Sequence, residues 1–236
     1  MACLNINGLL CHADNLRLFL STTNIDILAV NETKLDNSIL NDEVHIPGFD
    51  IVRKDRAVNG KNGGGVCFYI KTNLNFYVRN DLCDDDLEIL SVELTKPRSK
   101  SFIVSTWYRP PGSSLDLFKA FEDFVDKVDS FNLDYYILGD FNCDLKCSAG
   151  MSPATSHLNN IVDVYGLTQL ITEPTRVTNT SSTLIDVCYT NNPDKITRSG
   201  VYHLGISDHS LVFMTRKAKY EPMPSRTVQF RNWKKS

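Results

Sequence analysis

The sequence predicts a mixed fold of α-helices and β-strands, and three observations support this prediction. Short apolar runs of strand length alternate along the chain with stretches that have helical spacing. Polar residues able to do chemistry follow several of these runs directly, as in sites built at strand ends. The length of 236 residues suits one large domain or two small ones, and β-rich sandwiches of this size often fold as one domain.

The first seventy residues contain three predicted strands and one helix. The chain begins with a strand-like run at 2–6, and the helical spacing of apolar residues between 16 and 20 predicts a helix after it. An apolar run at 25–30 predicts the second strand. Three consecutive glycines at 63–65 form a hinge that opens a third strand, 66–70.

Two further strands, at 89–94 and 102–107, flank a predicted turn at 96–99. The helix that follows is predicted to begin with a capping box formed by Ser113 and Asp116. Apolar residues at helical spacing would line one face of this helix: Leu115, Phe118, Phe121, Val125 and Val128.

The most informative motif comes next. A short apolar run at 135–138 breaks at Gly139 into Asp140 and Asn142, which places a carboxylate and an amide at the end of a strand. The motif 207–210 places Asp208 and His209 beside the start of the last strand in the same way. Two carboxylates, an amide and an imidazole at strand ends can hold a hard metal ion and activate water against a phosphate.

The last third of the chain contains a second helix and three strands. Ser152 is the expected cap of this helix, Pro153 its first residue and Gly166 its stop signal. Apolar runs predict the closing strands near 184–189, 199–204 and 210–214.

Composition is ordinary for a globular protein, with 42% hydrophobic and 22% charged residues. The sequence has no apolar run of about 18 residues and no secretory signal pattern, so we expect no membrane association. The seven cysteines are dispersed and lack zinc-ligand spacing, which indicates reduced intracellular thiols.

Charge is unevenly distributed. Residues 216–236 carry seven Lys or Arg against one acid, Glu221, although the net charge of the whole chain is −3. The remainder is acidic, in part because of the run 81–88, which we expect to be a solvated loop. Since nucleic-acid-binding proteins usually have a basic surface, composition argues mildly against that class. We expect 217–236 to be a basic linker or arm.

Other polar residues also lie at predicted strand ends. Glu32 follows the second strand directly, Asn5 and Asn7 alternate with apolar residues on the first, and Tyr108 ends the strand before two prolines. Each of these alone fits an ordinary surface or packing residue. Asp186 lies within an apolar strand, where an ionised carboxylate needs a partner, and His209 is available. The occurrence of the whole set in one chain favours a functional site.

The motifs also resemble a known family. They occur in the order found in the endonuclease/exonuclease/phosphatase superfamily, which includes DNase I and exonuclease III. The resemblance covers about residues 1–216 and is greatest to the apurinic-endonuclease-like domain at the N-terminus of LINE-type non-LTR retrotransposon polyproteins. The superfamily resemblance rests on the motifs 5–8, 31–34, 107–110, 139–142, 185–186 and 207–209. The resemblance to the retrotransposon domain rests on 53–56, 63–66, 108–111 and 230–233.

The resemblance implies an α+β fold, a four-layer α/β-sandwich of two packed, mainly antiparallel β-sheets flanked by helices. It also implies that Glu32 and Asp208, with Asn7 nearby, hold Mg²⁺, for which Mn²⁺ may substitute. The metal would polarise the scissile phosphate, and Tyr108 would donate a hydrogen bond to the same phosphate.

The same resemblance assigns the remaining catalytic roles. Asp140 would orient and deprotonate the attacking water, which Asn5 and Asn142 would help to position. His209, paired with Asp186, would supply a positive hydrogen-bond donor to the phosphate as charge develops in the transition state.

Three positions depart from relatives in the superfamily. Thr183 stands where enzymes specialised for abasic sites carry an aromatic residue, so the apolar pocket for a flipped abasic sugar is not expected. Pro111 stands where repair enzymes have Asn, which removes or moves one phosphate contact. Asn7 replaces an Asp found in many relatives, which should weaken metal binding somewhat.

The predicted DNA contacts lie around the segment 178–183, which is polar and free of aromatic residues. Arg176 and Asn179 are the candidates for base contacts, with Thr178 beside them and Arg109 at the end of an earlier strand. Because so few side chains are available to contact bases, we expect nicking at many sequences, guided by DNA shape. Binding should be weak and salt-sensitive.

The resemblance therefore implies an Mg²⁺-dependent endonuclease that nicks double-stranded DNA and leaves 3′-hydroxyl and 5′-phosphate ends. In a retroelement the 3′-hydroxyl would prime reverse transcription of the element's RNA in the nucleus, and a reverse transcriptase domain would follow the basic arm. The alternatives are an abasic-site repair endonuclease, a phosphatase acting on inositol phosphates or lipids, and a catalytically dead remnant that binds nucleic acid.

Overall fold

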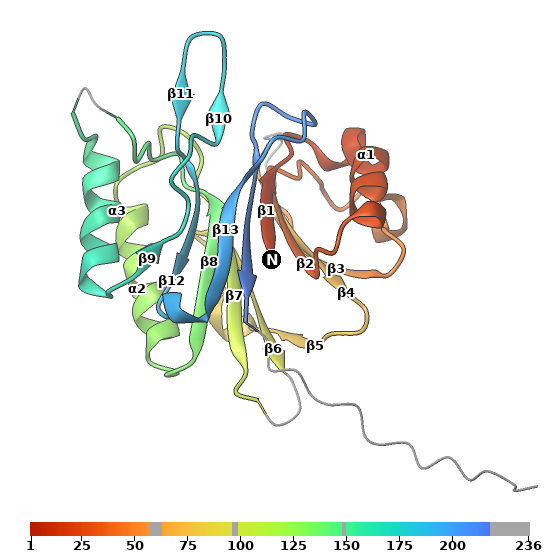
Figure 1. Ribbon diagram of the computed structural model, residues 1–236, viewed down its shortest axis with the longest axis horizontal. Helices are drawn as coiled ribbons and strands as arrows, with labels where there is room; N and C mark the ends of the chain where they lie inside the picture. Colours follow the sequence, from red (N-terminus) through yellow and green to blue (C-terminus); the bar gives the residue numbers. More distant parts are fainter. Residues whose placement is uncertain (57–62, 96–98, 148–149, 218–236) are drawn as a thin grey trace, which may run out of the picture.

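The computed structural model describes residues 1–56, 63–95, 99–147 and 150–217. Two six-stranded sheets pack face to face, with helix α1 (Leu9–Thr22) outside one sheet and α2 (Leu117–Asp129) and α3 (Pro153–Val164) outside the other (Figure 1). This arrangement confirms the predicted α+β sandwich. None of the described helices is long and apolar enough to cross a membrane.

The first sheet contains both the N-terminal strands and the last strands of the described chain. Its only parallel neighbours are β1 and β2, and its other neighbours run antiparallel. Its strands, in spatial order, are β13 (Ile196–Tyr202), β14 (Leu211–Arg216), β1 (Ala2–Asn5), β2 (Ile27–Asn31), β4 (Val66–Lys71) and β3 (Phe49–Lys54).

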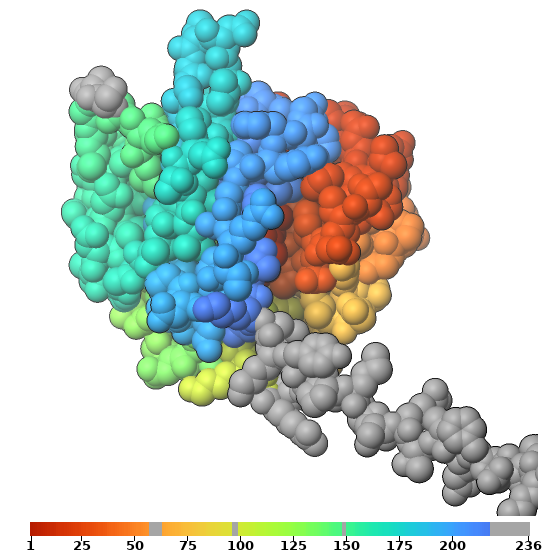
Figure 2. Space-filling model, viewed as in Figure 1, coloured from red at the N-terminus to blue at the C-terminus, as the bar shows by residue number. Residues whose placement is uncertain are grey.

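The second sheet has the same design. Only β7 and β8 are parallel neighbours in it. Its strands, in spatial order, are β5 (Asn75–Val78), β6 (Glu88–Thr95), β7 (Phe102–Tyr108), β8 (Asp134–Asp140), β12 (Asp186–Thr190) and β9 (Thr168–Gln169). A separate hairpin of β10 (Arg176–Val177) and β11 (Ser182–Thr183) projects from the body (Figures 1 and 2).

Three hydrophobic cores hold the four layers together, one between the sheets and one under each helical layer. Strand β7 contributes side chains to two of these cores. Ile103 and Trp107 pack toward α2 and α3, whereas Val104 and Tyr108 pack between the sheets. Because side chains alternate along a strand, a strand buried on both faces must be apolar almost throughout.

The predicted capping box of α2 is wrong. Asp116 is the N-cap residue of this helix, and its side chain makes no capping hydrogen bond. The Ser113 hydroxyl instead donates to the Pro110 carbonyl, 2.6 Å away, within the turn that precedes the helix. Ser113 lies in this turn, three residues before the N-cap residue Asp116, and so does not itself cap the helix.

The predicted limits of α3 are confirmed. The Ser152 hydroxyl accepts the Thr155 backbone N–H at 3.1 Å, and Pro153 is the first helical residue. Gly166 follows the helix with φ +59°, a left-handed conformation that ends helices and that glycine adopts at least cost.

Several short or half-exposed strands were not predicted, namely β3, β5, β9, β10 and β11. Residues 50–54 of β3 are exposed or only partly buried, so polar residues interrupt its apolar pattern. The acidic run 81–88 is less exposed to solvent than expected, because Leu82 and Leu87 are buried. The predicted turn at 96–99 and the basic arm at 217–236 lie almost wholly outside the described residues.

Candidate active site

Six strands bring polar side chains to one edge of the sandwich. Strands β1, β2, β7 and β8 end there, whereas β12 and β14 run antiparallel to their neighbours and begin there. Residues at strand ends and at strand starts therefore meet, although they are far apart in sequence. They are Asn5, Glu32, Tyr108, Asp140, Asp186 and His209.

Gly139 allows β8 to deliver Asp140 to this edge. Its φ is +156°, and a Cβ atom at this position would lie 1.9 Å from the carbonyl oxygen of Trp107 on the neighbouring strand. Only glycine permits this approach. The backbone N–H of Asp140 then donates to the side-chain oxygen of Asn31 at 2.9 Å, which fixes the end of the strand against the other sheet.

Asp140 is almost fully buried, with 1% of its surface exposed. One carboxylate oxygen accepts the amide N–H of Asn5 at 2.8 Å, and the other accepts the backbone N–H of Asn142 at 3.0 Å. Burial and the negative charge of Asp186 raise the pKa of Asp140 to about 7. A carboxylate whose pKa lies near neutrality is well suited to accept a proton from water.

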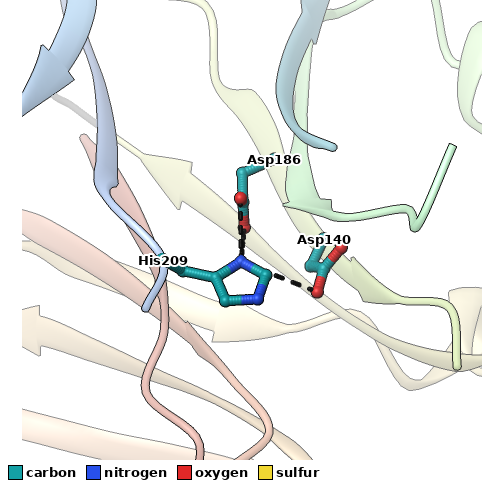
Figure 3. A group of neighbouring side chains, drawn as sticks. All are labelled: Asp140, Asp186 and His209. Atoms are coloured by element: carbon teal, nitrogen blue, oxygen red, sulfur yellow. Dashed lines mark hydrogen bonds and ion pairs between the residues drawn. The ribbon is translucent and has the colours of Figure 1, made fainter. Parts of the chain in front are cut away.

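His209 and Asp186 form a buried pair beside Asp140 (Figure 3). His209 Nδ1 lies 2.9 and 3.2 Å from the two oxygens of Asp186, and 3.9 Å from an oxygen of Asp140. Burial opposes the charged ring, but the hydrogen bond and charge of Asp186 outweigh it, with help from Asp140, and raise the pKa of His209 to about 9. The imidazolium is therefore the main form at neutral pH.

Hydrogen bonds from neighbouring residues orient this group. The Thr175 hydroxyl accepts the backbone N–H groups of Ile185 and Asp186 at 3.2 and 3.0 Å. The Ser207 hydroxyl accepts the His209 N–H at 3.2 Å and donates to the Asn5 carbonyl at 2.6 Å. Sequence reasoning assigned no role to Thr175, because a threonine near a strand gives no pattern that separates it from any other.

A small polar cavity of about 210 Å³ opens onto these groups. Apart from Pro111, every residue in its lining was a predicted site residue, so the structure brings most of the predicted set together. The lining consists of Asn5, Asn7, Glu32, Pro111, Asp140, Asn142, Arg176, Asp208 and His209. Tyr108 lies next to it and donates its hydroxyl to Glu32, and Asp186 lies behind His209.

The oxygen atoms of Glu32, Asp208 and Asn7 provide the donor set that a hard divalent cation prefers. Burial opposes the charge of Asp208, but Arg176, 2.7 Å away, and His209 keep its pKa below the ordinary value. Lys34 donates to the Asn7 amide oxygen and lies 3.7 Å from Glu32. Two anionic side chains in the lining of one cavity fit a divalent cation, although two cationic side chains compete for them.

A second group could also offer three ligands, since atoms of Asp140, Asp186 and His209 lie within 4.8 Å of one another. These three side chains already bond to one another or to their neighbours, since His209 Nδ1 lies 2.9 Å from Asp186 and the oxygens of Asp140 accept hydrogen bonds from Asn5 and Asn142. The donor chemistry therefore favours the side of the cavity formed by Glu32 and Asp208.

Backbone strain is concentrated around the same cavity. Asn7, Glu32, Lys34 and Asn142 have φ between +49° and +54°, a region that non-glycine residues rarely adopt. Among the described non-glycine residues, only Asn132 shares this conformation elsewhere. Such strain persists where surrounding contacts enforce it, and it is common at functional sites.

The predicted DNA-binding residues are not all brought to the cavity. Arg109 is unsuited to the contact predicted for it, because it is buried, donates to the Ser113 carbonyl at 2.9 Å and lies over the Phe118 ring. Arg176 lines the cavity at the base of the β10–β11 hairpin. Thr178 and Asn179 lie farther out along the hairpin.

The hydroxyl of Thr178 accepts the backbone N–H of Ser181 at 3.0 Å, so it closes the turn of the hairpin. Asn179 is exposed at this turn and remains accessible. Asn142 differs from expectation too, since its side-chain amide donates to the Arg109 carbonyl at 2.8 Å while its backbone N–H holds Asp140.

Comparison with known proteins agrees with this geometry. The model of the endonuclease/exonuclease/phosphatase family matches residues 2–209, which include all the strands that form the site except the last. The chain belongs to this family. Family membership identifies the protein as a hydrolase.

Solved structures of this family share the fold. The endonuclease domain of TRAS1, a telomere-specific non-LTR retrotransposon, superposes with a TM-score of 0.73 and 15% identity, covering 93% of this chain and 98% of that domain. The AP endonuclease LMAP from Leishmania major gives 0.78 and 15%, covering 92% of this chain and 87% of that chain. The 3′ phosphatase NExo from Neisseria, bound to a product DNA hairpin, gives 0.69 and 18%, with coverage of 92% and 98%. No curated protein matches the sequence significantly.

Proposed function

We propose that the protein is a metal-dependent phosphodiesterase that nicks double-stranded DNA and leaves 3′-hydroxyl and 5′-phosphate ends. The observation that carries this proposal is the arrangement of a buried carboxylate, Asp140, beside the Asp186–His209 pair at a cavity lined by Glu32 and Asp208. One cavity thus offers a base, a cationic donor and metal ligands.

Glu32, Asp208 and Asn7 would hold the metal ion, Mg²⁺ or Mn²⁺, which when bound neutralises and polarises the scissile phosphate. Tyr108 supports this side of the cavity. Burial and its bond to Glu32 raise the pKa of Tyr108 well above its usual value, so its hydroxyl stays protonated and can donate a hydrogen bond.

The proton transfer falls to Asp140. Its carboxylate would accept a proton from water as the water oxygen attacks phosphorus and the bond to the 3′ oxygen breaks, and the departing 3′-oxyanion would take up a proton from solvent to become the 3′-hydroxyl. Asn5 and the Asn142 backbone hold the carboxylate in place. With Nδ1 bound to Asp186, the imidazolium of His209 can donate from Nε2 to a phosphate oxygen as negative charge develops.

The proposed substrate and context come from the structural relatives. The TRAS1 domain is the endonuclease domain of a non-LTR retrotransposon, and this chain covers almost its full length. By analogy, the 3′-hydroxyl would prime reverse transcription of an element RNA by a reverse transcriptase partner in the nucleus.

The test is nicking of supercoiled plasmid by the purified chain. We expect open circles with Mg²⁺ or Mn²⁺, none with EDTA, and resealing by DNA ligase, which requires 3′-hydroxyl and 5′-phosphate ends. His209→Ala should abolish nicking, whereas His157→Ala, on α3 and away from the cavity, should not. A plasmid left intact by protein that hydrolyses an inositol phosphate would refute the proposal.

A duplex with a single abasic site separates nicking from repair. Thr183, on the β10–β11 hairpin, offers no aromatic surface for a flipped sugar. We therefore expect similar cleavage rates for intact and abasic duplexes. A large preference for the abasic duplex would instead favour a repair enzyme.

A further inference from the structure

We propose that Glu88, the first residue of β6, is a positioning residue that holds the metal-ligand side of the cavity in place through Arg56 and the glycine segment 63–65. This inference rests on the proposed function, because it takes Glu32 as a metal ligand. Glu88 does not line the cavity, and it matches none of the residues to which sequence reasoning gave a role.

The carboxylate of Glu88 joins two segments that are distant in sequence. Oε1 accepts Nε–H of Arg56 at 2.7 Å, and a second guanidinium nitrogen lies 2.5 Å from the same oxygen. Oε2 accepts the backbone N–H of Gly65 at 2.6 Å. The side chains of Glu88 and Arg56 are only 17% and 27% exposed, so water weakens this ion pair less than it would at an open surface.

The glycine segment in turn holds the backbone that follows Glu32. Thr33 donates its N–H to the Gly65 carbonyl at 3.1 Å, and Lys34 donates to the Gly64 carbonyl at 2.8 Å. A Cβ atom at Gly65 would lie 2.5 Å from the Thr33 hydroxyl, so glycine is required for this approach. These bonds fix two residues of a strained stretch, 32–34, in which Glu32 and Lys34 both have positive φ.

Arg56 supplies a second connection, which runs through Tyr108 to the carboxylate of Glu32. Its guanidinium carbon lies 5.9 Å from the centre of the Tyr108 ring, and the Tyr108 hydroxyl donates to Glu32. Glu88 thus supports Glu32 in two ways, through the backbone that the glycine segment holds and through the side chain that Tyr108 holds. Both the backbone and the side chain of one predicted metal ligand therefore depend on one partly buried carboxylate.

The chain contains a matched control on the same strand. Glu93 is buried and accepts a hydrogen bond from Arg79 at 2.6 Å. It also accepts a hydrogen bond from Ser101, and it lies near the end of β6 that points away from the cavity. Replacing Glu93 therefore breaks a comparable ion pair without disturbing the contacts of Glu32.

The experiment compares Glu88→Gln with Glu93→Gln in the whole chain. Mn²⁺ binding is followed by the electron paramagnetic resonance signal of the free ion, and thermal unfolding is measured in parallel. We expect Glu88→Gln to weaken Mn²⁺ binding by about 10- to 100-fold, the usual effect of removing support from a metal ligand. Glu93→Gln should lower the melting temperature and leave Mn²⁺ affinity unchanged. Higher Mg²⁺ concentration should restore nicking by Glu88→Gln.

The alternative, a purely structural Glu88, gives a different result. Unchanged Mn²⁺ affinity in Glu88→Gln would overturn the proposal, whatever the change in melting temperature. Should this variant not fold, Arg56→Lys takes its place, with the same two outcomes. Unchanged Mn²⁺ affinity in Glu32→Gln would overturn it as well. Wild-type protein that binds Mn²⁺ in a Glu88-dependent way but never nicks DNA would refute the proposed function and leave this inference standing.

Discussion

Asp186→Asn tests whether Asp186 sets the charge of His209. The substitution keeps the size of the side chain and removes its negative charge. The wild-type pair is bonded at 2.9 Å in a buried setting, and His209 has a pKa of about 9 instead of 6.5. A difference of this size corresponds to roughly 3 kcal/mol of preference for the charged ring.

Asp186 is the main cause of that preference, and Asp140, 3.9 Å from Nδ1, contributes less. In Asp186→Asn, burial still disfavours the charged His209 ring, and little remains to stabilise that charge. We expect the pKa of His209 to fall by about two pH units. The ring would be mostly neutral at pH 8, and nicking would fall because the cationic donor is lost.

Stability should change with pH in a defined direction. The pKa of His209 is higher in the folded than in the unfolded chain, so its contribution to stability is complete below pH 6.5 and is lost as pH rises toward 9. Asp140 also has a raised pKa, so it too stabilises the folded chain at low pH. Its contribution to stability is lost between about pH 4 and 7. Buried cysteines also have raised pKa values, and their contribution to stability begins to be lost near pH 9, so the difference between wild type and Asp186→Asn from pH 7 to 9 is the measure of His209.

The assay is a nuclear magnetic resonance titration of the histidine ring protons in EDTA, with urea unfolding at pH 6.5 and 9. Asp134→Asn is the control, since Asp134 begins the same strand that ends at Asp140 and pairs with Arg216 instead. Wild-type stability should fall across this interval, and that of Asp186→Asn should change much less. A His209 pKa that stays near 9 in Asp186→Asn would refute the reasoning.

Three further predictions follow from the site. Asp140→Asn should slow plasmid nicking by about 10²–10⁴-fold, yet urea unfolding at pH 8 should show no loss of stability, because the buried ionised carboxylate is itself unfavourable above pH 7. Gly139→Ala should destabilise the fold by about 1–3 kcal/mol or more in thermal unfolding, since its Cβ atom would meet the Trp107 carbonyl. Arg176→Gln should weaken DNA binding in filter-binding assays and reduce the salt slope by about one.

The sequence predicted best the strands that are buried on both faces. Strands β7 and β8 have almost continuous apolar sequences, because both faces contribute to a core. Strand β3 lacks that signal, since most of it is only half buried at a sheet edge. The β10–β11 hairpin gives no strand signal in the sequence, because four polar residues separate two very short strands.

The site was predictable for a related reason. A polar residue directly before or after a buried strand generally emerges at the sheet edge, so position along the strands grouped Asp140, Glu32 and His209. The same rule failed for Arg109, whose side chain turns back into the core and lies over Phe118. Whether a strand-end side chain turns outward depends on neighbouring elements, and their placement is not encoded locally.

Asn31 shows why the catalytic geometry depends on sheet packing. It is fully buried, and its amide donates to Thr106 of the opposite sheet at 2.9 Å while its oxygen accepts the backbone N–H of Asp140. Asn5, from the first sheet, donates to the Asp140 carboxylate. Buried polar groups without partners are costly, so these bonds favour one alignment of the two sheets. Asp140, the proposed base, is therefore positioned by the two packed sheets rather than by a loop, and a site built in this way can hold its geometry while the hairpin beside it varies.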